Sequence, residues 1–206
     1  MDARAYRGFA ATATGSAANA VVLPELHVFE VDQQTTFDVK EPLLANQRLT
    51  VASRKAIGYD FATDGQDGWA QKLLDEGFDP TVPTVWLLEG LLYYLSDSDV
   101  NAVMRHIGGL SAPRSAVFHD AVTQHYVSAG IRPGGAPFIS GSDDYLGLWH
   151  THAGFEAGFV RDFQSVRVDR RGRRLALDDD IRRSEASPAK CRGKDIVLFV
   201  EVEKVA

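Results

Sequence analysis

Three acidic residues stand where the sequence predicts that β-strands end. They are Asp32 at the end of residues 27–32, Asp60 in residues 55–61, and Glu89 at the end of residues 84–89. In an open α/β sheet, ligands bind at the carboxyl ends of the strands, and a carboxylate there can accept hydrogen bonds from ribose hydroxyls. Each acid alone is equally compatible with a turn or a helix cap. Together they predict a site for an adenosine-bearing ligand.

The elements that would position these acids alternate along the chain. From Val28 onward, strand-like and helix-like segments follow one another, which is typical of an α/β sheet with mostly parallel strands. The first predicted helix covers residues 33–47, where Pro42 should cause a kink or a late start. The second begins at about Trp69 and stops at Gly77. The third is capped by Ser96 and Asp99 and ends at Gly108-Gly109.

The C-terminal part predicts a change from parallel to antiparallel pairing. Residues 115–122 predict another strand, and residues 196–202 are expected to form an antiparallel hairpin with residues 159–168. Residues 123–142 are rich in Gly and Pro, so we expect a loop there and a loop or lid region over 123–154. The length of 206 residues fits a single domain, residues 1–206.

Composition argues against several classes of protein. The net charge of -6 opposes a nucleic-acid-binding face, and the arginines between Arg161 and Arg174 are interpreted as a solvated hairpin loop. The single cysteine, Cys191, excludes an intrachain disulfide and fits a reducing, cytoplasmic compartment. No apolar run approaches the roughly 18 residues that a membrane span needs. We therefore expect neither a nucleic-acid partner nor a membrane anchor.

Metal-dependent and nucleophilic chemistry also lack their usual motifs. His150 and His152 form an H-x-H pair, but the companion ligands of a zinc site are missing from the sequence pattern, so no metal is expected. The sequence contains no G-x-S-x-G elbow, Walker loop or Cys-His arrangement.

Four motifs occur together in order and carry a family resemblance. They are V-F-E-V-D-Q at 28–33, G-Y-D-F at 58–61, G-F-D-P at 77–80 and W-L-L-E-G-L-L-Y-Y-L at 86–95. With them, the chain resembles the leucine carboxyl methyltransferase-like family of S-adenosyl-L-methionine-dependent methyltransferases over nearly its whole length. The resemblance implies a Rossmann-like class I methyltransferase sheet and methyl transfer to a carboxylate or another small-molecule acceptor.

The same resemblance implies a role for each candidate residue. Asp32 would bind the ribose hydroxyls of the cofactor, and Asp60 would accept a hydrogen bond from the adenine amino group. Phe61 would lie against the adenine ring, and Glu89 would complement the ammonium or the sulfonium. Tyr94 is similar to the family's tyrosine after that acid, although a core aromatic fits the pattern equally well. No catalytic residue is implied, because transfer to an ionised oxygen needs no general base.

The beginning of the chain differs from the family pattern. Residues 1–8 resemble the end of the first cofactor motif, so the first strand and its glycine-rich turn are expected to be missing, through truncation or an incomplete gene model. An organelle transit peptide is the alternative for the Ala-, Ser- and Thr-rich first 23 residues, but Asp2, Tyr6 and Phe9 oppose it.

Two rival functions remain open from the sequence. A nicotinamide-dependent oxidoreductase also places an acid after its second strand to bind ribose, but residues 86–95 and the C-terminal hairpin oppose that class. A non-catalytic remnant is the other rival, because loss of a central strand would harm both stability and cofactor binding. Oligomeric state and the identity of the acceptor are not predicted.

Overall fold

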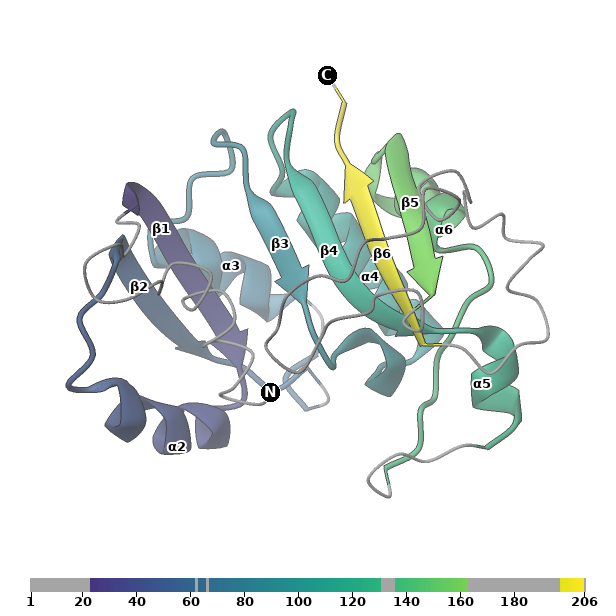
Figure 1. The fold of residues 1–206 in the computed structure, drawn as a ribbon, viewed down its shortest axis with the longest axis horizontal. Coiled ribbons are helices and arrows are strands. Elements are labelled where there is room, and N and C mark those ends of the chain that lie inside the picture. The colour runs from purple at the N-terminus through teal and green to yellow at the C-terminus, as the bar shows by residue number, and fades with distance from the viewer. Residues whose placement is uncertain (1–22, 62, 66, 131–135, 163–196, 206) are drawn as a thin grey trace, which may run out of the picture. The chain divides into compact units, whose positions relative to one another are not determined.

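The computed structural model describes residues 23–61, 63–65, 67–130, 136–162 and 197–205 (Figure 1). The chain forms two compact units, residues 1–78 and 79–206, each with its own β-sheet. The single-domain organisation therefore stays a prediction. The expectations for residues 1–22 and most of the arginine-rich loop lie outside the described residues.

The first unit is built on two parallel strands. β1 (Leu23–Asp32) and β2 (Val51–Gly58) pair with Asp32 opposite Gly58, and α2 (Gln34–Leu44) connects them. The predicted second strand, 55–61, lies a few residues closer to the C-terminus than the observed strand β2. The strand ends at Gly58, and beyond it the Asp64 amide donates to the Asp60 carbonyl at 2.8 Å.

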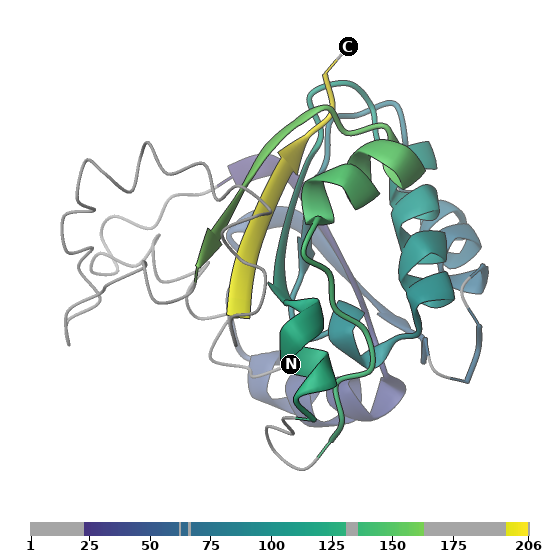
Figure 2. The ribbon, with the colours of Figure 1, turned by 90° about the vertical axis from the view of Figure 1, so that its right-hand side faces the viewer.

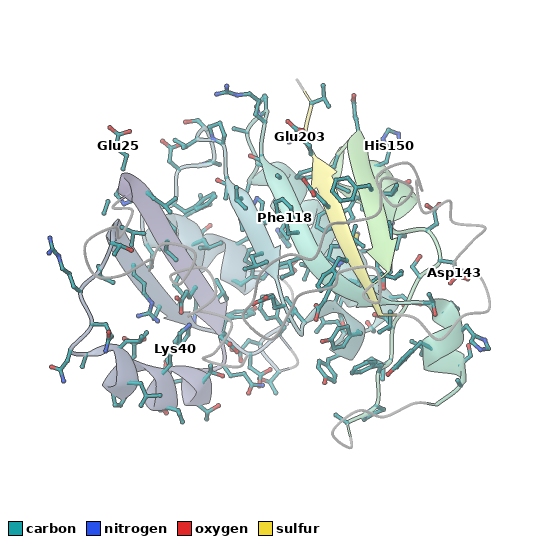
Figure 3. The ribbon with its side chains drawn as sticks, in the orientation of Figure 1. Glu25, Lys40, Phe118, Asp143, His150 and Glu203 are labelled. Carbon is teal, nitrogen blue, oxygen red and sulfur yellow. The ribbon has the colours of Figure 1, made fainter. Side chains whose placement is uncertain are left out.

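One face of the β1–β2 sheet carries a charged network. Glu30 accepts hydrogen bonds from Lys40 of α2 at 2.6 Å and from Arg54 of β2 at 2.8 Å. All three side chains are at most 12% exposed, and Figure 3 labels Lys40 on α2. The hydrogen bond to Glu30 raises the pKa of Arg54. The network attaches α2 to the sheet, and Pro42 is accommodated inside the helix rather than ending it.

α3 (Gly68–Asp75) supplies much of the apolar core of the first unit. Its residues Trp69 and Leu73 are buried, as is Phe78 just beyond its end. The Phe78 ring packs edge-on against Phe29 of β1, with 5.5 Å between the ring centroids. α3 ends at Asp75, and Gly77, where the helix was expected to stop, follows its cap residue with a φ of +87°.

The second unit contains a mixed sheet of four strands. Their order is β3 (Val85–Leu88), β4 (Ala116–Val122), β6 (Val197–Glu203) and β5 (Ala157–Asp162). β3 and β4 are parallel, whereas β6 is antiparallel to both β4 and β5. The C-terminal antiparallel hairpin is thus confirmed. Among the described strands of this sheet, β3, β4 and β5 run in one direction and β6 alone runs in the other, which agrees with the expected mostly parallel sheet.

Helices α4 (Asp97–Gly109) and α6 (Tyr145–Ala153) lie against one face of this sheet (Figure 2). The Ser96 side chain caps α4 by accepting from the Asp99 amide, and α4 ends at Gly109, both as predicted. Gly108 allows the helices to approach closely, because a Cβ added there would lie 2.6 Å from the Ala153 carbonyl oxygen.

The described residues of 123–154 include two helices. α5 (Gln124–Ser128) and α6 both lie in it, and both have side-chain caps. Thr123 accepts from the Tyr126 amide, and Asp144 accepts from the Gly147 amide. The Gly and Pro content of residues 123–142 concealed the first of these caps. The expectation of a loop is wrong at α5 and α6, whereas a lid role for residues 123–154 stays a prediction.

The opposite face of the four-stranded sheet carries exposed apolar side chains. Val85 and Leu87 of β3 are 64% and 49% exposed, Phe118 of β4 is 37% exposed, and Phe199 of β6 is 38% exposed. Leu87 and Phe118 are direct neighbours in the parallel register, and Figure 3 labels Phe118 on β4. The sheet of the second unit is therefore asymmetric, with its core on the side of α4 and α6.

Candidate functional site

Asp32 is the last residue of β1 and its carboxylate is held in place. Its Oδ1 atom accepts from the Gln33 amide at 2.8 Å and from the Thr36 hydroxyl at 3.3 Å. Among the described residues, no group donates a hydrogen bond to its Oδ2 atom. The carboxylate thus has a fixed orientation at the carboxyl edge of the strand and one oxygen available for a ligand.

Gln33 brings Asp60 to the same edge. Its side-chain amide donates to Asp60 Oδ2 at 3.2 Å, and the parallel register places Asp32 opposite Gly58, two residues before Asp60. The Asp60 amide in turn donates to the Asp64 carboxylate at 3.1 Å, which braces the turn after β2. The first unit therefore joins two of the predicted acids, Asp32 and Asp60, through one residue that the sequence reasoning did not select.

Phe61 follows directly and is half-buried. Its ring contacts Tyr59 edge-on at 5.3 Å and Trp69 of α3 at 5.8 Å between centroids. Tyr59 is itself fixed, since its hydroxyl donates to the carbonyl of Asp64 at 2.9 Å. These contacts hold an aromatic ring beside Asp60 at the end of the strand.

The chemistry of this edge fits the adenosine part of S-adenosyl-L-methionine. The available oxygen of Asp32 can accept from a ribose hydroxyl, and such charge-assisted bonds are the stronger kind of hydrogen bond. A carboxylate beside an aromatic ring, as in Asp60 and Phe61, can accept from an exocyclic amine while the ring packs on a planar base. Asp32, Asp60 and Phe61 are the residues of the first unit that could hold such a cofactor.

Glu89 belongs to the second unit, where it directly follows β3. The next residue, Gly90, has a φ of +64°, a conformation that glycine adopts readily. The Gly90 amide donates to Asp120 Oδ1 at 2.9 Å, and the Tyr93 hydroxyl donates to Asp120 Oδ2 at 3.0 Å. Asp120 of β4 thus fixes the turn that carries Glu89.

Sequence reasoning missed both Asp120 and Tyr93. An acid near the carboxyl end of the apolar strand 116–122 was the available signal for Asp120, because such strands rarely carry an unpaired charge. Burial raises the pKa of Asp120. Burial also raises the pKa of Tyr93, and the charge of Asp120 adds to that increase. The phenol therefore remains a hydrogen-bond donor at neutral pH.

An aromatic cluster surrounds Tyr93. We call Tyr93, Tyr94, Tyr126 and Phe138 the four-ring cluster. Phe138 contacts the other three rings, with centroid distances of 4.2, 5.2 and 5.7 Å to Tyr93, Tyr94 and Tyr126. Tyr94 is 42% exposed and so lies at the surface, not in the core. The cluster connects the 3₁₀ helix η1 (Leu92–Tyr94), which follows Glu89, to α5 and to residues 136–142.

His119 is the buried histidine of the described residues, and its contacts point to a structural role. The Trp149 indole donates to its Nε2 atom at 2.9 Å, and its Nδ1 atom lies 3.0 Å from the Asp120 carbonyl. Burial lowers the pKa of His119 to about 4. Its neutral ring therefore joins β4 to α6.

Two negative findings concern the described part of the chain only. The His, Cys, Asp and Glu side chains there form no group of three that could hold a metal ion. Its helices also include none that is long and apolar enough to cross a membrane.

Comparison with known proteins identifies the family. The family model described as leucine carboxyl methyltransferase matches residues 1–108. The chain belongs to this family. Similar proteins include a putative S-adenosyl-L-methionine-dependent methyltransferase of Mycobacterium sp. (strain JLS). It is 35% identical over 134 residues, which cover 65% of this chain and 39% of that protein. A Mycolicibacterium vanbaalenii relative, also described as a putative S-adenosyl-L-methionine-dependent methyltransferase, is 40% identical over 89 residues, 43% of this chain and 28% of that protein.

The resemblance predicted from the four motifs is thereby confirmed, and with it the assignment to a family of S-adenosyl-L-methionine-dependent methyltransferases. The matched part spans less than half of the length of each of these curated relatives.

Solved structures support the fold. A putative methyltransferase from Thermobifida fusca is similar with a TM-score of 0.53 and 17% identity, covering 87% of this chain and 64% of that one. An O-methyltransferase family protein from Burkholderia thailandensis is similar with a TM-score of 0.51 and 15% identity, covering 89% and 45%. These likenesses confirm the α/β methyltransferase fold.

Proposed function

We propose that the protein is an S-adenosyl-L-methionine-dependent methyltransferase in which Asp32, Asp60 and Phe61 bind the adenosine part of the cofactor. The observation that carries this proposal is the linked pair of acids at the end of β1 and β2, where Gln33 donates to Asp60 at 3.2 Å beside the oriented carboxylate of Asp32. Family membership supports the choice of cofactor.

The chain's own residues would bind and orient the cofactor rather than transfer protons. Asp32 would accept from the ribose hydroxyls, Asp60 from the adenine amine, and Glu89 would complement the ammonium or the sulfonium. When bound, the cofactor supplies the methyl group as a sulfonium-activated electrophile, so the protein contributes mainly alignment and exclusion of water. The acceptor is a carboxylate or another small molecule.

Calorimetric titration tests this function. We expect S-adenosyl-L-methionine and S-adenosylhomocysteine to bind to the purified chain and NAD to bind at least about tenfold more weakly, which is a difference of about 1.4 kcal/mol in binding free energy. Tighter binding of NAD than of S-adenosylhomocysteine would contradict the proposal and favour the nicotinamide class.

A non-catalytic remnant is the second candidate. The pairing of the strands favours it, because among the described strands β1 has β2 as its one partner and β3 has β4 as its one partner. Within each unit these are edge strands, which expose unpaired backbone groups. Absence of binding by all three ligands to a folded chain would support this candidate and contradict the first.

A further inference from the structure

The four-ring cluster presents an exposed aromatic side chain at the surface. Tyr94 exposes 42% of its surface, and the neighbouring Ile139 exposes 52%. Tyr94 meets Tyr93 and Phe138 edge-on, at 4.9 and 5.2 Å between centroids. An exposed aromatic ring that two further rings support is suited to packing against a planar molecule.

The cluster is held in place by backbone hydrogen bonds. The amides of Ile139 and Ser140 donate to the Tyr93 carbonyl at 2.8 and 3.4 Å. The buried Ser140 hydroxyl donates to the Leu92 carbonyl at 2.9 Å. Phe138 is therefore fixed against the η1 turn before any ligand arrives, which lowers the entropic cost of binding.

The charge beside the cluster is negative. Asp120 accepts the Tyr93 hydroxyl hydrogen bond, and the charges of Asp120 and Glu89 both raise the pKa of Tyr93. The described residues of η1, α5 and 136–142 include no lysine or arginine, and His125 is the one titratable nitrogen among them. A bound anion would meet repulsion from the two carboxylates, whereas a neutral ring would not.

We propose that the four-ring cluster is the acceptor-binding surface and that it takes a planar aromatic acceptor with a neutral hydroxyl in preference to a carboxylate. In that reaction the hydroxyl oxygen would accept the methyl group as the bond from methyl to sulfur breaks, and the hydroxyl proton would pass to solvent water. The role as acceptor site rests on the proposed methyltransferase function. Binding of the planar molecule rests only on the rings and the charges, so it can be measured without the cofactor.

The test uses two probes that differ in charge. 2-Naphthol is neutral at pH 7 and 2-naphthoate is an anion of the same ring system. Each is titrated into the full chain without cofactor, with the affinity followed by saturation-transfer NMR or calorimetry. We expect 2-naphthol to bind at least about fivefold more tightly than 2-naphthoate.

Variants then locate the binding site. Tyr94→Ala should weaken 2-naphthol binding about fivefold or more, and Tyr94→Phe, which keeps the ring, should restore most of the affinity. Because Tyr94 lies at the surface, its truncation leaves the core intact, which circular dichroism checks. Val85→Ala is the matched control, since Val85 is exposed on β3 and should leave the affinity unchanged.

Three results would overturn the proposal. They are equal or tighter binding of 2-naphthoate, no binding of either probe, and 2-naphthol binding that Tyr94→Ala does not weaken. Failure of S-adenosylhomocysteine to bind is a separate result. It contradicts the methyltransferase function but leaves the naphthol titration to decide whether the cluster binds planar molecules.

Discussion

Tyr93 donates a hydrogen bond from its hydroxyl to Asp120 Oδ2 at 3.0 Å, and this bond joins the turn after β3 to the end of β4. The second carboxylate oxygen accepts from the Gly90 amide at 2.9 Å, so both oxygens of Asp120 are used inside the second unit. The position of Glu89, which directly precedes Gly90, therefore depends on a carboxylate in the neighbouring strand.

Asp120→Asn should not destabilise the protein at pH 8. Burial raises the pKa of Asp120, so the folded state disfavours its charged form, whereas asparagine can still accept from Gly90 and donate to Tyr93. A carboxyl group with a raised pKa binds a proton more tightly in the folded state, so the wild type gains stability relative to the variant as pH falls. Urea unfolding at pH 8 and pH 5 measures the free energy of unfolding of both proteins. Any advantage of Asp120→Asn over the wild type at pH 8 should shrink or reverse at pH 5.

Tyr93→Phe provides the comparison. It removes the donor but keeps the ring in the four-ring cluster, and we expect it to lower the free energy of unfolding by about 1 kcal/mol at pH 8. A larger loss of stability in Asp120→Asn than in Tyr93→Phe at that pH would show that the charge of Asp120 stabilises the fold and that the interpretation of its burial is wrong.

His119 should make the fold sensitive to acid. Its pKa is lowered to about 4 in the folded state by burial, against 6.5 for an ordinary histidine. The unfolded chain therefore binds the proton first as pH falls below 6.5, and stability is lost down to about pH 4. The difference between the two pKa values corresponds to a decrease of about 3 kcal/mol at most in the free energy of unfolding. His119→Gln, which can still accept from Trp149, should show a smaller loss over that pH range, and equal pH dependence of the two proteins would contradict the assignment.

Gly108 and Gly109 form a matched pair at the end of α4. A Cβ at Gly108 would lie 2.6 Å from the Ala153 carbonyl oxygen, whereas one at Gly109 would meet nothing within 4 Å. We expect Gly108→Ala to lower stability by about 1 to 3 kcal/mol through overpacking of α4 against α6. Gly109→Ala should be neutral or stabilising by up to about 1 kcal/mol, because alanine favours helix. Equal effects in thermal unfolding would show that the close approach is absent.

The sequence was sufficient to predict those features whose signals lie within a few residues of the chain. Ser96 as the cap of α4, Gly77 at the end of the first unit's second helix, and Asp32 and Glu89 at strand ends were all readable from side-chain chemistry and periodicity. Each is determined within a few residues of the chain, and the four motifs correctly predicted the family.

The remaining features depend on partners distant in sequence. The Gln33 hydrogen bond to Asp60 and the Tyr93 hydrogen bond to Asp120 each join residues 27 positions apart, so no local pattern could reveal them. The start of β1 at Leu23 was also missed. Leu23 pairs with Val51, but the register shifts between Leu23 and His27, so this irregular start of the strand depends on β2 and not on a local pattern.

Binding of S-adenosylhomocysteine to Asp32→Asn tests the central claim most directly. The control is Asp38→Asn, an exposed acid on α2 that accepts from Gln34 and has no role in the proposed site. Loss of the charge-assisted bond to ribose should weaken binding about tenfold or more in Asp32→Asn, and the control should bind as the wild type does. Unchanged affinity in Asp32→Asn, measured by calorimetry on a folded protein that binds the ligand, would contradict the assignment of Asp32 to the cofactor site.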